Sequence, residues 1–344
     1  MLTQGAGEFT GRRFFGMNRL SEEPMDVLKL IGRWRYPVPI VYSDAYWMPN
    51  IGRHIFPVQK YRALYERLLF LGARKDQIAT PGPAADEDVL LVHTPRYIKR
   101  LQTGTLSGAE VAMLELPYSP DLVRFAWVTV GGTILTVRLA LEKGLAVHLG
   151  GGFHHAYSDH GEGFCMLNDV AIAVEKFRKE GGCRRAMVVD CDLHQGNGTA
   201  NILRGKDYAL TFSIHQMDIY PAEKEQSSVD VGLWSGATDQ EYLGSLRGCI
   251  PRLYDEFGPD LVIYLAGADP YEHDQLGGLR LTQRGLRARD VLVIGEARRR
   301  RIPVAVVLAG GYAAEFEDTV AIHLNTVRVA QRVQRRFPQP PAPA

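Results

Sequence analysis

Short apolar runs alternate with amphipathic stretches of helical spacing through the second half of the chain, and this alternation restricts the fold more than any other feature. The apolar runs cover residues 145–149, 186–189, 208–213, 261–266 and 304–309. The helical stretches lie near residues 169–180, 239–256, 283–300 and 313–335. Strands that alternate with helices are joined by crossovers and therefore pair in parallel. The sequence thus predicts an α/β fold built on a parallel sheet.

The chain divides into three parts. Residues 1–36 contain glycines and charges with little periodicity, so we expect an N-terminal arm or peripheral segment there. One folded domain is expected over residues 37–336, beginning with an edge strand at 37–42 and a helix between residues 57 and 72. Residues 337–344 are rich in proline and are expected to form a disordered tail.

Charge and cysteine usage limit the partners and the compartment. The net charge is only +1, which gives no general attraction to nucleic acid or to a membrane surface. The longest apolar region, 126–149, is interrupted by charged residues, so we expect no membrane span. The four arginines at 298–301 are expected to be a solvated helix end, where cations are favoured. Four cysteines without CxxC spacing and the lack of a secretory signal indicate reduced thiols and a cytoplasmic protein.

Polar residues follow four of the predicted strands, at the points where these strands end. Ligands of open parallel sheets gather beyond the carboxyl ends of the strands. We therefore expect these polar side chains to lie together at one edge of the sheet. They are His154, His155, Asp190, Asp192, His194, Asp269 and Tyr312.

Three of these residues could hold a metal ion. Asp192 and His194 stand two apart and project to one side of an extended chain, and Asp269 arrives from another strand. Two carboxylates and one imidazole leave a coordination position open, as in catalytic zinc sites, although the oxygen-rich set also suits iron(II). An ordinary capped loop is the alternative reading of the Asp-x-Asp-x-His run taken alone.

The remaining groups fit proton transfer and carbonyl binding. His154 and His155 could move protons, and Asp190 could accept a hydrogen bond from one imidazole and fix its tautomer. Tyr312 could donate to a developing oxyanion, or it could be a core tyrosine. Aromatic residues near the same edge could line a narrow channel, with a core role as the alternative for each.

These motifs in combination resemble the zinc-dependent histone deacetylase superfamily over about residues 37–328. The resemblance is carried by the runs 150–155 (GGGFHH), 190–194 (DCDLH), 194–198 (HQGNG) and 310–312 (GGY). Within the superfamily the chain looks most like the class IV deacetylases and their bacterial relatives, on the runs 150–155, 194–198 and 276–279 (LGGL). The resemblance implies a single-domain arginase/deacetylase-like fold, in which helices flank the central parallel β-sheet on both faces.

The resemblance also implies roles for individual residues. Asp192, His194 and Asp269 would bind zinc, and His155 would act as general base and then general acid, with help from His154. Tyr312 would polarise the acyl carbonyl. Four residues would form the substrate channel: Gly163, Phe164, Tyr220 and Leu276. A structural potassium ion would be held near the zinc loop by Asp190, Asp192, His194, Ser213 and Ile214.

Two comparisons within this fold refine the expectation. Asn197 stands where class I deacetylases have an aspartate behind the second histidine, and a neutral partner should make that imidazole less basic. The two-manganese site of arginase needs extra carboxylates at positions that are Gly196 and Gly267 in this chain. A binuclear ureohydrolase is therefore disfavoured.

The expected function is a zinc-dependent amidohydrolase that removes acetyl or longer fatty acyl groups from lysine side chains of proteins or peptides. One alternative is hydrolysis of acetylpolyamines or other small acylated amines, for which Glu272 and Asp274 lie near the expected channel mouth. A non-catalytic acyl-lysine-binding scaffold is the other alternative. The motifs are common to these alternatives, so they specify neither the acyl length nor the oligomeric state.

Overall fold

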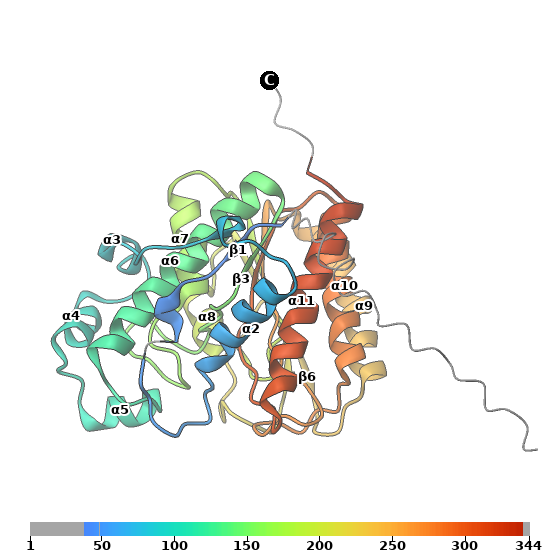
Figure 1. The fold of residues 1–344 in the computed structure, drawn as a ribbon. Helices are drawn as coiled ribbons and strands as arrows, with labels where there is room; N and C mark the ends of the chain where they lie inside the picture. Colours follow the sequence, from blue (N-terminus) through green and yellow to red (C-terminus); the bar gives the residue numbers. More distant parts are fainter. Residues whose placement is uncertain (1–37, 48, 340–344) are drawn as a thin grey trace, which may run out of the picture.

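A computed structural model describes residues 38–47 and 49–339 of the chain, which are coloured by sequence in Figure 1. The expected arm at 1–36, the first residue of the strand expected at 37–42, and residues 340–344 of the expected tail lie outside the described residues.

Eight strands in the described residues form one sheet, and every neighbouring pair is parallel. The spatial order is β2-β1-β3-β8-β7-β4-β5-β6. The strands are β1 (Ile40–Val41), β2 (Ile78–Ala79), β3 (Leu145–His148), β4 (Ala186–Asp190), β5 (Ala209–Gln216), β6 (Val229–Leu233), β7 (Leu261–Leu265) and β8 (Val304–Val307).

All five predicted apolar runs are strands, with ends shifted by one to three residues. The prediction of an edge strand at 37–42 is wrong, because β1 lies between β2 and β3. The short strand β2 covers that edge. Neither β2 nor β6 was predicted: β2 has only two residues, and β6 is a half-exposed strand at the other edge whose apolar residues alternate with Asp230 and Gly232.

Helices precede or connect these strands. The helix expected between residues 57 and 72 is α2 (Gln59–Phe70), and the predicted crossover helices are α7 (Asp169–Lys179), α9 (Asp239–Phe257), α10 (Gln283–Arg299) and α11 (Phe316–Arg336). The remaining helices are η1 (Asp44–Tyr46), η2 (Lys75–Gln77), α3 (Asp86–Val89), α4 (Pro95–Thr103), α5 (Gly108–Leu114), α6 (Pro120–Lys143) and α8 (Asn197–Leu203).

The helices cover both faces of the sheet. In Figure 1, α9, α10 and α11 lie side by side on one side of the strands, with α2 packed on α11, while α6 and α7 lie on the other side. The four central strands β3, β8, β7 and β4 are buried along their whole length. This burial explains why their sequences are continuous apolar runs.

The long helix α6 has clear start and stop signals. The Ser119 side chain accepts from the Leu122 N–H, Pro120 occupies the first turn, and Gly144 ends the helix in the left-handed conformation at φ 87°. By length and composition α6 alone among the described helices could cross a membrane, in spite of its charged residues. In the protein, 67% of its apolar window is buried, as expected for a core helix.

The prediction of a solvated arginine cluster at 298–301 is wrong for Arg298. Its side chain is buried at the end of α10, where Nη1 donates to the Ile302 carbonyl and Nη2 to the Gln339 side chain. Arg300 instead pairs with Asp255 and Glu296 near the surface. Arg298 is buried because the last turn of α10 lies close to the start of β8.

A second buried arginine lies beneath the carboxyl ends of β4 and β7. Arg289 of α10 is fully buried, and its Nη1 donates to the carbonyls of Cys191 (3.1 Å) and Gly267 (2.6 Å). Asp290 is its charge partner, with Oδ1 2.9 Å from Nη2. Asp290 also accepts from the Tyr264 and Thr326 hydroxyls. Arg289 therefore joins the two loops that follow β4 and β7.

We expect Arg289→Met to lower the free energy of unfolding by about 3–5 kcal/mol, because it leaves the Asp290 carboxylate buried without its charge partner. Urea unfolding followed by circular dichroism measures this loss. Arg247→Met, at an exposed position on the neighbouring helix α9, is the matched control and should leave stability almost unchanged. Equal stability of the two variants would contradict the assigned role of Arg289.

Candidate active site

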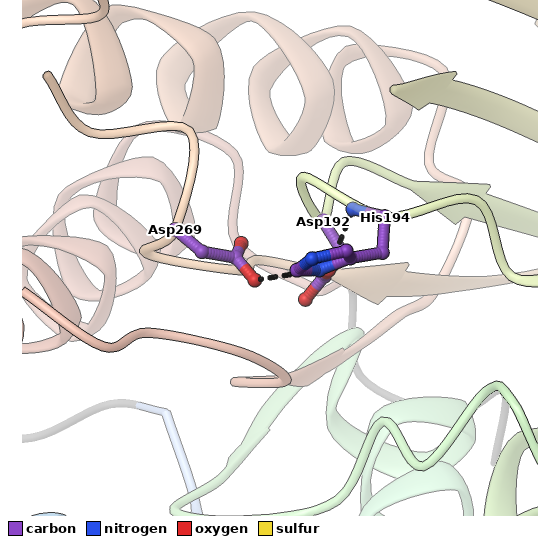
Figure 2. Close-up of side chains that lie close together, drawn as sticks. All are labelled: Asp192, His194 and Asp269. Carbon is purple, nitrogen blue, oxygen red and sulfur yellow. Dashed lines mark hydrogen bonds and ion pairs between the residues drawn. The ribbon is translucent and has the colours of Figure 1, made fainter. Parts of the chain in front are cut away.

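The segments at the ends of β3, β8, β7 and β4 carry the predicted metal ligands, both histidines and Tyr312, and these four strands are adjacent in the sheet. Asp192, His194 and Asp269 converge there, and their ligand atoms all lie within 4.8 Å of one another. Figure 2 shows the His194 ring beside both carboxylates. His194 Nδ1 lies 3.3 Å from Asp192 Oδ1 and 3.5 Å from Asp269 Oδ2. All three side chains are buried.

The donor set fits a metal ion. Asp269 Oδ2 is buried and has no hydrogen-bond partner among the described residues. A buried carboxylate oxygen without a hydrogen bond is costly unless a cation compensates it. Burial and the like charge of Asp192 raise the pKa of Asp269 to about 6, which is the response of two carboxylates that share one site. The three residues could therefore hold a divalent ion beside this unbonded oxygen.

Main-chain groups hold these ligands in place. The Leu193 N–H donates to Asp269 Oδ1, and the Gly310 N–H donates to Asp192 Oδ2. A side chain at Gly310 would be excluded, because its Cβ would lie 2.0 Å from Asp269 Oδ2. Gly267 is similarly close, at 2.6 Å from Asp269 Oδ1. The second of these contacts gives a steric reason, beside the missing ligand, against a carboxylate at position 267.

The two adjacent histidines have different partners. His154 Nδ1 lies 2.6 Å from Asp190 Oδ2, and His155 Nδ1 lies 2.7 Å from Asn197 Oδ1. Burial opposes charge on His154, but Asp190 and Asp192 raise its pKa to about 9. Burial, together with repulsion by His154 and His194, holds the pKa of His155 well below its usual value. The pair thus combines a charged imidazole with a neutral one.

Tyr312 lines the same cavity as His155. Burial and the charges of Asp269 and Asp192 raise the pKa of its phenol well above the usual value, so the hydroxyl remains a proton donor. Its backbone N–H donates to Asp274 Oδ2. Lys60 was not predicted: it is buried, donates to the Ala309 carbonyl at 2.8 Å, and lies 5.6 Å from the Tyr312 ring centroid.

A cavity leads from the surface to these groups. It encloses about 550 Å³, part of it open to solvent, and the predicted channel residues lie on its wall. The His155 and Tyr220 rings meet edge to face at 5.0 Å, and the Phe164 and Tyr312 rings do so at 6.0 Å. The lining residues are Glu115, His155, Gly163, Phe164, His194, Tyr220, Leu276 and Tyr312.

Acidic residues near the cavity differ from those expected. Asp274 is buried and accepts from the backbone N–H groups of Leu276 and Tyr312, so it is not at the mouth. Glu272 is exposed but does not line the cavity. Glu115 does line it, at the end of α5, where its backbone is left-handed at φ 56°. No sequence motif surrounds Glu115, and only the folded loop brings it to the opening.

The residues expected at a potassium site also lie together. Asp190 is the register partner of Ser213 in the β4–β5 pair, and Ile214 follows in β5. Asp190 Oδ1 accepts from the Asp192 N–H. The four cysteines of the chain are free thiols, three of them buried.

A buried carboxylate–imidazole cluster beside paired histidines, at the end of a parallel sheet, is the arrangement expected of a metal-dependent hydrolase. The family model for the histone deacetylase domain matches residues 54–327. Histone deacetylase 2 of Arabidopsis thaliana is 30% identical over 312 residues, covering 87% of this chain and 81% of the plant protein. The histone deacetylase-like amidohydrolase of Pseudomonas aeruginosa is 27% identical over 279 residues, covering 74% and 72% of the two chains. An uncharacterised protein of Picosynechococcus is 40% identical over 296 residues, covering 86% and 99%.

The chain belongs to the histone deacetylase family and is a hydrolase that acts on amides. Its single parallel sheet with helices on both faces agrees with the arginase/deacetylase-like fold that the motifs implied. The family is typically metal-dependent, and a buried Asp–His–Asp cluster is present at this edge of the sheet.

We expect metal affinity to rise with pH. Burial opposes charge on His194, but the adjacent carboxylates of Asp192 and Asp269 raise its pKa to about 10. An incoming ion must displace that proton, and each proton released strengthens binding about tenfold per pH unit. Titration of the stripped protein with Zn²⁺ and a competing chelator between pH 6.5 and pH 8 measures the slope. Asp269→Asn should abolish stoichiometric binding, and a pH-independent affinity of the unsubstituted protein would contradict this account.

Proposed function

We propose that the protein is a zinc-dependent hydrolase that removes acyl groups from lysine side chains. One observation carries the proposal: His194 of the buried Asp–His–Asp cluster lines the same cavity as His155 and Tyr312. Metal-assisted amide hydrolysis needs these groups together, namely an ion, a proton acceptor and a hydrogen-bond donor for the oxyanion.

Asp192, His194 and Asp269 would hold the ion. Zinc suits two carboxylates and one imidazole with a position left open, and iron(II) is the alternative for the same donors. When bound, such an ion lowers the pKa of water and polarises a carbonyl group. The proposal includes a structural potassium ion near Asp190 and Ser213, with Asp192, His194 and Ile214 as further ligands. Its support is the register of β4 and β5.

The chain's own groups move the protons. His155 donates its Nδ1 proton to Asn197, so its Nε2 is free to take a proton from the attacking water. Tyr312 donates its phenolic proton in a hydrogen bond to the acyl oxygen as negative charge develops there. His154, held cationic by Asp190, stabilises that charge and shares in returning a proton to the leaving amine.

The residues that line the cavity favour an unbranched, slender substrate. Aromatic rings of Phe164 and Tyr220 on its walls suit an unbranched acyl-lysine chain, with Leu276 at the opening. The acyl group removed is proposed to be acetyl or a longer fatty acyl group. We also propose that the chain is most similar to the class IV deacetylases within the family. Free, mostly buried thiols support a reducing, cytoplasmic setting.

We expect Tyr312→Phe to lower kcat roughly 10²–10³-fold, the usual cost of removing one oxyanion donor. Steady-state hydrolysis of an acetyl-lysine peptide by the zinc-loaded protein measures this effect, with zinc content checked in parallel. Tyr208→Phe is the matched control, because Tyr208 bonds to Glu175 away from the cavity and should not affect turnover. Near-normal turnover of a zinc-loaded Tyr312→Phe protein would overturn the assigned role.

Hydrolysis of a small acylated polyamine is the second candidate. The observation that favours it is Glu115, an exposed acidic residue among those that line the cavity, whose negative charge could attract a cationic chain. The non-catalytic scaffold has less support, because every ligand and proton-transfer group of the motifs is present and they converge in space.

Glu115→Gln separates the two substrates. If a polyamine is the substrate, loss of the carboxylate should raise KM for acetylspermidine several-fold, with little change for a neutral acetyl-lysine peptide. Glu272→Gln, which removes an exposed carboxylate outside the cavity lining, is the matched control. Equal kinetics of Glu115→Gln and the unsubstituted protein on acetylspermidine would contradict the polyamine candidate.

A further inference from the structure

A carboxylate lies directly behind the asparagine that supports His155. Glu162 Oε1 accepts from Asn197 Nδ2 at 2.6 Å and from the Tyr220 hydroxyl at 2.6 Å. Its Oε2 lies 3.5 Å from His160 Nε2, and its side chain is 16% exposed. Burial opposes charge on Glu162, but hydrogen bonds from His160, Tyr220 and Asn197 hold its pKa below the usual value. Glu162 is therefore ionised and accepts hydrogen bonds only.

The acceptor-only character of Glu162 determines how the asparagine is oriented. A carboxamide has an oxygen at one side and an NH₂ group at the other, and rotation by 180° exchanges them. With Nδ2 against Glu162, Oδ1 must face His155. In the rotated orientation, Asn197 Nδ2 would face His155 Nδ1. Asn197 Oδ1 would then face the carboxylate of Glu162, with no proton between the two oxygens.

The orientation of the asparagine decides the tautomer of the histidine. An oxygen opposite Nδ1 requires the proton on Nδ1, so Nε2 carries the lone pair toward the cavity. An N–H opposite Nδ1 would place the proton on Nε2, the atom that must accept one. A neutral asparagine can therefore support His155 only while its amide is prevented from rotating.

We infer that Glu162 is a positioning residue of the hydrolase: it fixes the amide of Asn197 and, through it, the proton of His155 on Nδ1. Its negative charge also polarises the amide, because hydrogen bonds in a chain strengthen one another. Glu162 thus replaces part of the support that an aspartate in direct contact would give. The inference depends on the proposed function only for the role of His155 Nε2 as proton acceptor.

The tautomer is measured directly by ¹⁵N NMR of histidine-labelled protein, with His155 assigned through His155→Gln. We expect an Nδ1–H tautomer in the unsubstituted protein and a mixture of tautomers in Glu162→Ala and Glu162→Gln, because an alanine or a neutral amide no longer fixes Asn197. An unchanged tautomer in both variants would overturn the inference. This readout needs no turnover, so it fails or succeeds separately from the proposed function.

Kinetics provide the second test. We expect Glu162→Gln to lower kcat about 10- to 100-fold, the usual cost of losing an outer hydrogen-bond partner. Asp159→Asn is the matched control, because Asp159 pairs with the opposite side of His160 and should leave kcat unchanged. Tyr220→Phe removes the Tyr220 hydrogen bond to Glu162 and leaves the carboxylate in place. An equal loss in that variant would assign the effect to the channel wall and overturn the inference.

A double substitution distinguishes positioning from general damage. Asn197→Asp alone places a second carboxylate against Glu162, so we expect it to lower kcat. Adding Glu162→Gln supplies an amide that donates to the new carboxylate, and kcat should rise again relative to either single variant. Independent, multiplying losses in the double variant would contradict the inference.

Discussion

The carboxylates of Asp192 and Asp269 are buried together at the ends of the adjacent strands β4 and β7, and much of the surrounding structure compensates their charge. Buried like charges are costly unless cations or hydrogen bonds oppose them. His194 contacts both groups, and backbone N–H groups of two loops donate to them. Arg289 donates hydrogen bonds to the carbonyls of Cys191 and Gly267 in the loops that carry Asp192 and Asp269. The site is therefore preorganised around a position that suits a cation.

The same buried environment gives two neighbouring histidines different chemistry. His154 and His155 are equally enclosed, yet a carboxylate stands behind the first and a carboxamide behind the second. The pKa of the first imidazole is raised and that of the second is lowered, and in the proposed mechanism this difference separates charge stabilisation from proton acceptance. In the proposed mechanism the pair of His155 and Asn197 requires the Asn197 amide oxygen to face His155. We infer that the carboxylate of Glu162 fixes this orientation without placing a charge next to the His155 ring.

The sequence predicts the centre of the molecule better than its margins. The runs at 145–149, 186–189, 261–266 and 304–309 read as strands because strands buried on both faces must be apolar throughout, and motif residues follow them directly. The two-residue strand β2 and the half-exposed β6 carry too weak a pattern, so the sheet order at both edges was missed. The sequence did not predict the roles of four further residues, because these roles come from contacts between distant segments. These residues are Lys60, Glu115, Glu162 and Arg289. The neighbouring sequence does not distinguish a buried arginine that bonds to two loops from a solvated one. Arg298, which was expected to be solvated, is buried as well.

The central claim is that Asp192, His194 and Asp269 bind one catalytic ion facing Tyr312 and His155. Its most direct test is a crystal structure of the zinc-loaded protein with a hydroxamate, a group that chelates metals and mimics the hydrated acyl carbon. The expected result is a single anomalous peak at the zinc edge, about 2.0–2.2 Å from the three side chains, with the hydroxamate oxygens on the ion and against the Tyr312 hydroxyl. An ion bound elsewhere, or a hydroxamate that leaves these three ligands uncoordinated, would contradict the account.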